Sequence, residues 1–275
     1  MPPAYLAARR RGVPVVIHEQ NPLPGLANRL GARLTRYVAT TYAGTPLPHA
    51  VHTGMPLRAE IGELGGLDAA ARAVAMRAAR AELGLRPDLP TLLVFGGSLG
   101  AQRLNETFAA AAAEVRAAGV QVLHVSGLGK AVDVPVEGPT PYVVVPYVDR
   151  MQVAYAAADV AVCRSGANTV CEPATVGLPG VYVPLPVGNG EQRLNAEPLV
   201  RAGGGLLVDD AACTPDWVRT VVLPLLRDEA AVRSMGEAAR GFAVPHADER
   251  LADLVDAAIE GVAPSTLRSV PGGAA

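Results

Sequence analysis

Short apolar runs alternate with longer amphipathic stretches along most of this chain. After residue 90, strand-like runs rich in Val and Leu occupy Thr91–Phe95, Gln121–Ser126, Tyr142–Pro146, Val160–Arg164, Gly180–Pro184 and Gly205–Val208. Helical stretches lie between most of them, over Gln102–Ala118, Arg150–Ala157, Ala167–Val176 and Glu191–Ala202. Apolar strands that alternate with helices predict an α/β fold with a parallel, doubly wound sheet covered on both faces.

The N-terminal part shows a shorter version of this alternation. Helices are expected at 4–11 and Leu26–Thr35, and strands at Val13–His18, Tyr37–Thr40 and Val51–Thr53. Because a doubly wound domain normally begins on a strand, we expect this first domain to be incomplete. After Gly54-Met55-Pro56, an Ala/Arg-rich helix covers Leu67–Leu83, and closing helices are predicted over Pro215–Leu226, Glu229–Phe242 and Asp248–Ile259.

These patterns define the expected domain organisation. We predict a first α/β domain at 1–55, a second domain at 56–245, a C-terminal helix at 246–262 that packs back on the first domain, and a disordered tail at 263–275.

Composition narrows the possible functions. The formal net charge of -2 gives no electrostatic reason to bind nucleic acid. Cys163, Cys171 and Cys213 are odd in number and lack metal-ligand spacing, which favours a reduced cytoplasmic setting and predicts neither a metal site nor a cofactor. No apolar run reaches the ~18 to 20 residues of a membrane span, and the N-terminus does not resemble a signal peptide.

Three polar loops are predicted at carboxyl ends of strands in the second domain. The first, Phe95-Gly96-Gly97-Ser98-Leu99-Gly100, leads into a helix, so its backbone N–H groups could face an anion. An ordinary strand-to-helix turn is the alternative, and the sequence fits neither a Walker loop nor the full dinucleotide fingerprint.

The second loop is Cys163-Arg164-Ser165-Gly166, again between a strand and a helix. Since proline is tolerated best in the first turn of a helix, Pro173 places Glu172 near the positive helix end. Glu172 could accept hydrogen bonds from a ribose diol or simply complement the dipole.

The third loop runs from Pro184 to Gly190, and Glu191, Gln192 and Asn195 follow it with groups suited to sugar hydroxyls. A solvated helix start is the alternative. In the first domain, His18-Glu19-Gln20-Asn21 also ends a strand, where a structural loop is the favoured interpretation.

The motifs HEQNPLPGLANR, GGSLGAQRLN, CRSGANTVCE and PLPVGNGEQRLNA, in this order, resemble the MurG family of glycosyltransferase family 28, and its actinobacterial branch in particular. These are bacterial UDP-N-acetylglucosamine (UDP-GlcNAc) transferases of peptidoglycan synthesis. The resemblance implies a GT-B architecture, two Rossmann-like domains of which the N-terminal one is incomplete here. It also implies metal-free, inverting transfer of N-acetylglucosamine to lipid I, giving lipid II, by a peripheral protein on the cytoplasmic face of the cell membrane.

The resemblance also implies site residues. Gly97 and Ser98 would face the diphosphate, Glu172 the ribose, and Val148 the uracil, with Arg58 nearby. The remaining implied contacts, several of them to the sugar, come from Asn21, Ser165, Gly166, Ala167, Glu191, Gln192 and Asn195. Two positions depart from the family pattern: Glu191 replaces a frequent Gln, and Met55 replaces a frequent Asn.

The family pattern begins with a GGTGGH-type loop, whose His is a candidate base, and this sequence lacks it. We therefore expect the base to lie upstream of this sequence; His18 is the only other candidate, and a weak one. Two alternatives follow: a donor-binding but inactive protein, and another GT-B transferase acting on a lipid or natural product.

Overall fold

The computed structural model describes residues 2–97, 101–135 and 137–264, and the chain forms two compact units. The first unit comprises Met1–Arg58 and Ala243–Ala275, and the second comprises Ala59–Phe242. The sequence placed these limits at 55 and 245. Most of the expected disordered tail, residues 265–275, lies outside the described residues, as does Ser98.

The second unit is built on a six-stranded sheet whose order is β6-β5-β4-β7-β8-β9, with every neighbouring pair parallel. The strands are β4 (Thr91–Phe95), β5 (Gln121–Val125), β6 (Tyr142–Val145), β7 (Val160–Cys163), β8 (Gly180–Tyr182) and β9 (Gly205–Leu207). From β4 the chain winds outward to β6, returns to the centre at β7 and winds outward on the other side. The predicted α/β fold with a doubly wound parallel sheet is confirmed.

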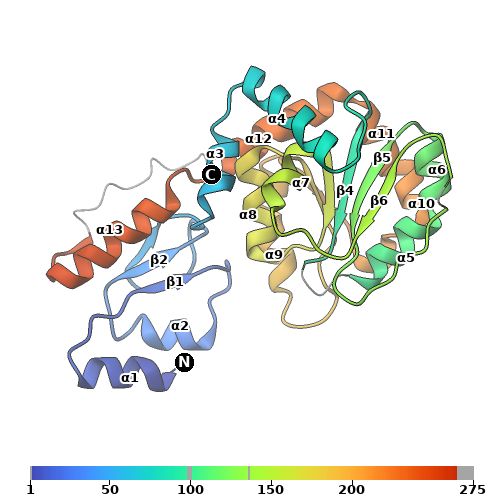
Figure 1. Cartoon of the computed structure of the whole chain (residues 1–275). Coiled ribbons are helices and arrows are strands. Elements are labelled where there is room, and N and C mark those ends of the chain that lie inside the picture. Colours follow the sequence, from blue (N-terminus) through green and yellow to red (C-terminus); the bar gives the residue numbers. More distant parts are fainter. Residues whose placement is uncertain (1, 98–100, 136, 265–275) are drawn as a thin grey trace. The chain divides into compact units, whose positions relative to one another are not determined.

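Helices cover both faces of this sheet (Figure 1). One face carries α5 (Gln102–Ala110), α6 (Ala112–Ala117), α10 (Pro215–Trp217), a π-helical turn at Val218–Val222 and α11 (Leu223–Arg227). The other carries α3 (Ala59–Gly65), α4 (Ala69–Glu82), α7 (Met151–Ala157), α8 (Ala167–Val176) and α9 (Glu191–Arg201), with α12 (Glu229–Phe242) packed against α8. The helix α3 was not predicted, and the single helix expected over Gln102–Ala118 is interrupted at Ala111.

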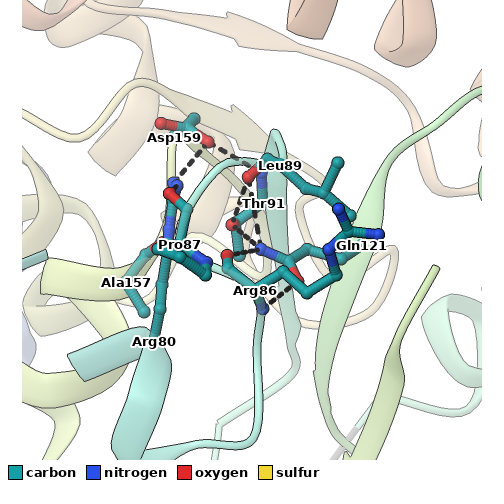
Figure 2. A network of polar contacts seen from close by, with 8 residues as sticks. All are labelled: Arg80, Arg86, Pro87, Leu89, Thr91, Gln121, Ala157 and Asp159. Atoms are coloured by element: carbon teal, nitrogen blue, oxygen red, sulfur yellow. Dashed lines mark hydrogen bonds and ion pairs between the residues drawn. The ribbon is translucent and has the colours of Figure 1, made fainter. Parts of the chain in front are cut away.

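The amino ends of the central strands are closed by a polar network (Figure 2). Arg80, only 3% exposed, pairs with Asp159 at 2.8 Å, and the same carboxylate oxygen accepts the backbone N–H of Thr91 at 2.7 Å. Beside it, the Gln121 amide donates to the Arg86 carbonyl at 2.7 Å and accepts the Arg86 N–H at 2.8 Å. These polar groups are engaged with one another at the amino edge of the sheet, whereas ligands of open α/β sheets bind at the carboxyl edge.

The first unit contains a three-stranded parallel sheet in the order β1 (Ile17–Glu19), β2 (Val38–Thr40), β3 (Ala50–His52). One face packs on α13 (Ala247–Glu260) through Leu254, Ala257 and Ala258. The unit also contains α1 (Pro2–Arg10) and α2 (Leu26–Gly31), which contact each other. The strand β1 starts later than the expected Val13, because its pairing partner β2 is only three residues long.

Candidate functional site

The order of the strands locates a ligand site in the second unit. Phe95 and Cys163, the last residues of β4 and β7, are neighbours in the sheet. The chain leaves these two strands toward helices on opposite faces, α5 and α8. Ligands of open α/β sheets bind outside the carboxyl ends of strands at this switch point. The loops that meet there are Gly96–Gly97 and Arg164–Gly166, two of the three loops singled out in the sequence.

The Gly96–Gly97 turn has the backbone geometry expected of a ligand-facing loop. Gly97 has φ = +84°, a left-handed conformation that favours glycine, and an added Cβ would meet nothing within 4 Å. Because there is room for a Cβ, it is the positive φ and not a lack of space that favours glycine at this position. The same open space leaves the backbone of the turn accessible to a ligand.

A buried polar chain fixes α5, the helix that follows this turn. The Asn105 amide donates to the Ser126 carbonyl at 2.9 Å, so its Oδ1 accepts from His124 Nε2 at 3.0 Å. Because Nε2 carries the proton, His124 Nδ1 is free to accept a hydrogen bond from the Tyr142 hydroxyl at 2.9 Å. Burial lowers the pKa of His124 to about 4, so the ring is neutral near pH 7 and can serve as donor on one side and acceptor on the other.

A side chain of α9 holds the turn that follows β7. Gln192 Oε1 accepts the backbone N–H of Ser165 at 3.3 Å and that of Leu185 at 3.0 Å, which joins the loops after β7 and β8. Gly166 is the N-cap of α8 and makes no side-chain cap, and Ala167 is the first helical residue. The first N–H groups of α8 therefore lie beside the switch point without a capping side chain, where they can bind an acceptor.

Asn195 lies beneath the same turn. Its amide donates to the Ser165 carbonyl at 3.2 Å, and its side chain is 1% exposed. In this structure Asn195 supports the turn from within, so a direct contact with a sugar hydroxyl would require the side chain to become accessible. The buried Ser165 Oγ and Asn195 Oδ1 have no hydrogen-bond partner among the described residues.

Glu172 does not lie at the start of α8, which corrects the argument made from Pro173. The helix runs over Ala167–Val176 as predicted, but Pro173 is inside it and there is no acidic residue in its first turn. Pro173 begins the last turn of the helix. The helix ends at Gly177, which adopts φ = +68°, and the Leu178 N–H donates back to the Pro173 carbonyl at 2.8 Å. The helix dipole therefore does not account for a glutamate at this position. The Glu172 carboxylate is held by a hydrogen bond from the Tyr155 hydroxyl at 2.7 Å.

Arg164 holds together the loops on one side of the switch point, a role that was not predicted from the sequence. Its guanidinium donates to the carbonyls of Val183 and Pro184 at 3.1 Å each and pairs with Asp210 at 2.6 Å. These contacts join the ends of β7, β8 and β9. Arg103, on the first turn of α5, approaches the same Asp210 carboxylate at 3.5 Å. Two features of the sequence could have indicated this ion pair: an arginine next to a Ser-Gly turn, and an acidic residue after a later strand end.

Two further predicted residues of this unit lie after β6 and at the start of α9. Val148 is half-buried three residues after β6. Glu191 is the first residue of α9 and accepts a hydrogen bond from the Asn189 amide at 2.7 Å.

In the first unit, Glu19 organises the loop that carries Asn21. Its carboxylate is 3% exposed and accepts the N–H of Asn21 and of Gly25 at 3.0 Å each, and the Asn28 amide at 2.9 Å. Asn21 is half-buried, and Arg58 is exposed at the end of this unit.

His18 is engaged within the first unit. Its Nε2 lies 3.1 Å from the Gly54 carbonyl, an acceptor that requires this nitrogen to carry the proton, and 3.2 Å from Thr41 Oγ1. Burial lowers the pKa of His18 below its usual value. Nε2 is therefore a donor in a structural hydrogen bond, which disfavours it as a catalytic base.

Within the described residues, no group of three or more His, Cys, Asp or Glu side chains could hold a metal ion. Over the same residues, no helix has the length and hydropathy needed to cross a bilayer.

Comparison with known proteins agrees with this geometry. The model of the glycosyltransferase family 28 C-terminal domain matches residues 91–251, and that of the N-terminal domain matches residues 2–40. The UDP-N-acetylglucosamine–N-acetylmuramyl-(pentapeptide) pyrophosphoryl-undecaprenol N-acetylglucosamine transferase of Frankia casuarinae is 55% identical over 257 residues, 92% of this chain and 67% of that protein. The enzyme of the same name from Thermobifida fusca is 52% identical over 266 residues, 96% of this chain and 68% of that protein.

A solved structure gives the same result. The crystal structure of Acinetobacter baumannii MurG superposes with a TM-score of 0.71 at 29% identity, covering 93% of this chain and 70% of that one. The fold and the switch-point site thus define a GT-B glycosyltransferase. The chain belongs to glycosyltransferase family 28, and the resemblance to MurG drawn from its motifs is confirmed.

Proposed function

We propose that the second unit binds UDP-GlcNAc at the carboxyl ends of β4 and β7. The observation that carries this proposal is the convergence of the Gly97 turn and the uncapped start of α8 on one switch point. Backbone N–H groups from a glycine turn and a helix start form a favourable environment for a diphosphate. The names of the curated relatives identify the nucleotide sugar.

Each site residue receives a proposed role. Gly97 faces the diphosphate, a contact also expected of Ser98, which lies outside the described residues, and the Ser165–Gly166 turn presents the first N–H groups of α8, including Ala167. Glu172 accepts hydrogen bonds from the ribose diol, and Val148 contacts uracil. The hydroxyl groups of N-acetylglucosamine are held by Gln192, Glu191 and Ala167. Asn195 supports the turn and contacts the sugar if it becomes accessible.

The proposed reaction transfers N-acetylglucosamine to lipid I and gives lipid II. A hydroxyl oxygen of the acceptor attacks the anomeric carbon, whose bond to the diphosphate oxygen breaks, so that UDP leaves and the configuration inverts. The acceptor proton passes to a general base. Hydrogen bonds to the diphosphate stabilise the negative charge that develops on UDP. The reaction as proposed requires no metal.

We also propose that the protein works as a peripheral protein on the cytoplasmic face of the membrane. In the first unit Leu26 is 82% exposed, Val13 54% and Leu6 49%. Arg9 and Arg10 end α1, and Arg29 lies in the last turn of α2. Exposed apolar side chains near arginines suit a surface of anionic lipid, since the charges are attracted to headgroups and the leucines can insert.

A transfer assay tests the proposed reaction. UDP-GlcNAc labelled in its sugar is incubated with the protein and a water-soluble lipid I analogue, and the product is separated from unreacted UDP-GlcNAc by chromatography and counted. We expect label in a disaccharide product of the lipid II type, and much less with Glu172→Gln. Donor binding without transfer would instead support the alternative, a donor-binding protein that is not itself active.

A further inference from the structure

Tyr155 lies at the switch point, although no motif drew attention to it. It is in α7 and is 3% exposed. Its ring packs against that of Phe95, with ring centroids 6.0 Å apart and an interplanar angle of 59°. Phe95 is the last residue of β4, directly before the Gly96–Gly97 turn. Tyr155 therefore contacts the strand that presents the proposed diphosphate loop.

The hydroxyl of Tyr155 is directed to a different element. It donates to Glu172 Oε2, on α8, at 2.7 Å, a normal length for an O–H···O hydrogen bond. Burial first, and then the charge of Glu172, raise the pKa of Tyr155 well above its usual value, so the hydroxyl keeps its proton and acts as donor. A carboxylate offers about four acceptor positions, so one bond from Tyr155 is compatible with further bonds from a ligand.

We propose that Tyr155 is a positioning residue for ribose recognition, which holds the Glu172 carboxylate in the orientation that accepts hydrogen bonds from the uridine 2′- and 3′-hydroxyls. This inference rests on the proposed donor site. A glutamate has several rotatable bonds, and a carboxylate fixed before binding loses less freedom when the ribose arrives. Because Tyr155 is also packed on Phe95, it joins the ribose side of the site to the strand that carries the diphosphate turn.

The chain offers a matched control for this tyrosine. Tyr182 in β8 is also buried, at 0% exposure, and its hydroxyl has no hydrogen-bond partner among the described residues. Tyr182→Phe removes a buried hydroxyl from the same unit without touching Glu172. Tyr155→Phe keeps the ring that packs on Phe95 and removes only the bond to the carboxylate.

The experiment compares UDP with 2′-deoxy-UDP by titration calorimetry. The ratio of their dissociation constants measures recognition of the 2′-hydroxyl and is insensitive to a general weakening of the site. A hydrogen bond to a charged group predicts a ratio of roughly tenfold or more for the unsubstituted protein. We expect Tyr155→Phe to reduce the ratio to about a third or less of that value, and Tyr182→Phe to leave it unchanged. Thermal melting of each variant establishes that it is folded.

The results separate failure of the inference from failure of the proposed site. Glu172→Gln must lower the ratio; if it does not, or if the unsubstituted protein does not discriminate, the ribose role of Glu172 is wrong and the inference falls with it. If Glu172→Gln lowers the ratio but Tyr155→Phe does not, only the positioning role is overturned. In the double variant, Tyr155→Phe should add nothing to the change caused by Glu172→Gln, because it acts through that carboxylate.

Discussion

Arg164 and Asp210 form an ion pair of 2.6 Å between the loops that follow β7 and β9, and both side chains are largely buried. The same guanidinium nitrogen reaches two carbonyls after β8. Three of the strand ends that surround the proposed donor site are therefore held by one side chain.

Replacing Arg164 by Met should destabilise the second unit by about 3 kcal/mol or more, because removing one partner leaves a buried charge uncompensated. Urea unfolding at pH 7 measures the loss. Arg193→Met is the control, since its ion pair with Asp209 is exposed and should contribute less than about 1 kcal/mol. Equal losses for the two variants would show that the buried pair does not hold the loops together.

The Gly97 turn can be tested through its backbone conformation. Gly97→Ala introduces a Cβ at φ = +84°, which costs about 1–2 kcal/mol and should distort the turn. If N–H groups of the turn bind the diphosphate, the affinity for UDP should fall roughly tenfold. Gly84→Ala carries a similar strain, at φ = +71° before β4, and should leave UDP affinity unchanged. The diphosphate role is wrong if the two variants bind UDP equally well.

The buried His124 predicts a pH dependence of stability. Its pKa is about 4 in the folded protein and about 6.5 when unfolded, so the unfolded chain binds more protons between these values. Stability is fully present above pH 6.5 and is lost as the pH falls toward 4, with a loss on the order of 2 kcal/mol by pH 5.

Fluorescence of Trp217, the only tryptophan, follows urea unfolding of the second unit. His124→Gln, which cannot titrate, should show a smaller difference between pH 7.5 and pH 5 than the unsubstituted protein. An identical pH dependence in both proteins would mean that His124 is not buried in its neutral form.

Membrane association can be tested at Leu26. Leu26→Asp should reduce cosedimentation with vesicles that contain anionic lipid by roughly tenfold, since inserting a leucine contributes about 1.5–3 kcal/mol. Val74→Asp, at a side chain 58% exposed in the second unit, is the control and should bind as before. Salt should weaken binding, because it screens the arginines. Unchanged binding by Leu26→Asp would exclude this residue from the membrane contact.

The periodic pattern of apolar residues was enough to predict most of the second unit. Thr91–Phe95, Ala167–Val176 and Glu229–Phe242 begin and end where the pattern placed them, because the apolar residues that set their periodicity are buried or half-buried. The short helix Ala59–Gly65 was missed, since seven residues carry too little periodicity.

The site was predictable where a loop conformation restricts the residue type, as the left-handed conformation does at Gly97. It was not predictable where function depends on contacts between distant segments. Tyr155 and Glu172 are 17 residues apart along the chain, and Arg164 reaches residues after two later strands. The interior position of Pro173 also contradicted the expectation that a proline lies in the first turn of a helix.

The central claim is that the second unit recognises a UDP-sugar through its strand-end loops, and titration calorimetry tests it most directly. We expect the protein to bind UDP-GlcNAc, to bind GDP-mannose, dTDP-glucose and ATP far more weakly, and to lose tenfold to hundredfold in UDP-GlcNAc affinity with Glu172→Gln while remaining folded. Equal affinity for the four nucleotides, or an undiminished affinity in the folded Glu172→Gln variant, would contradict the account.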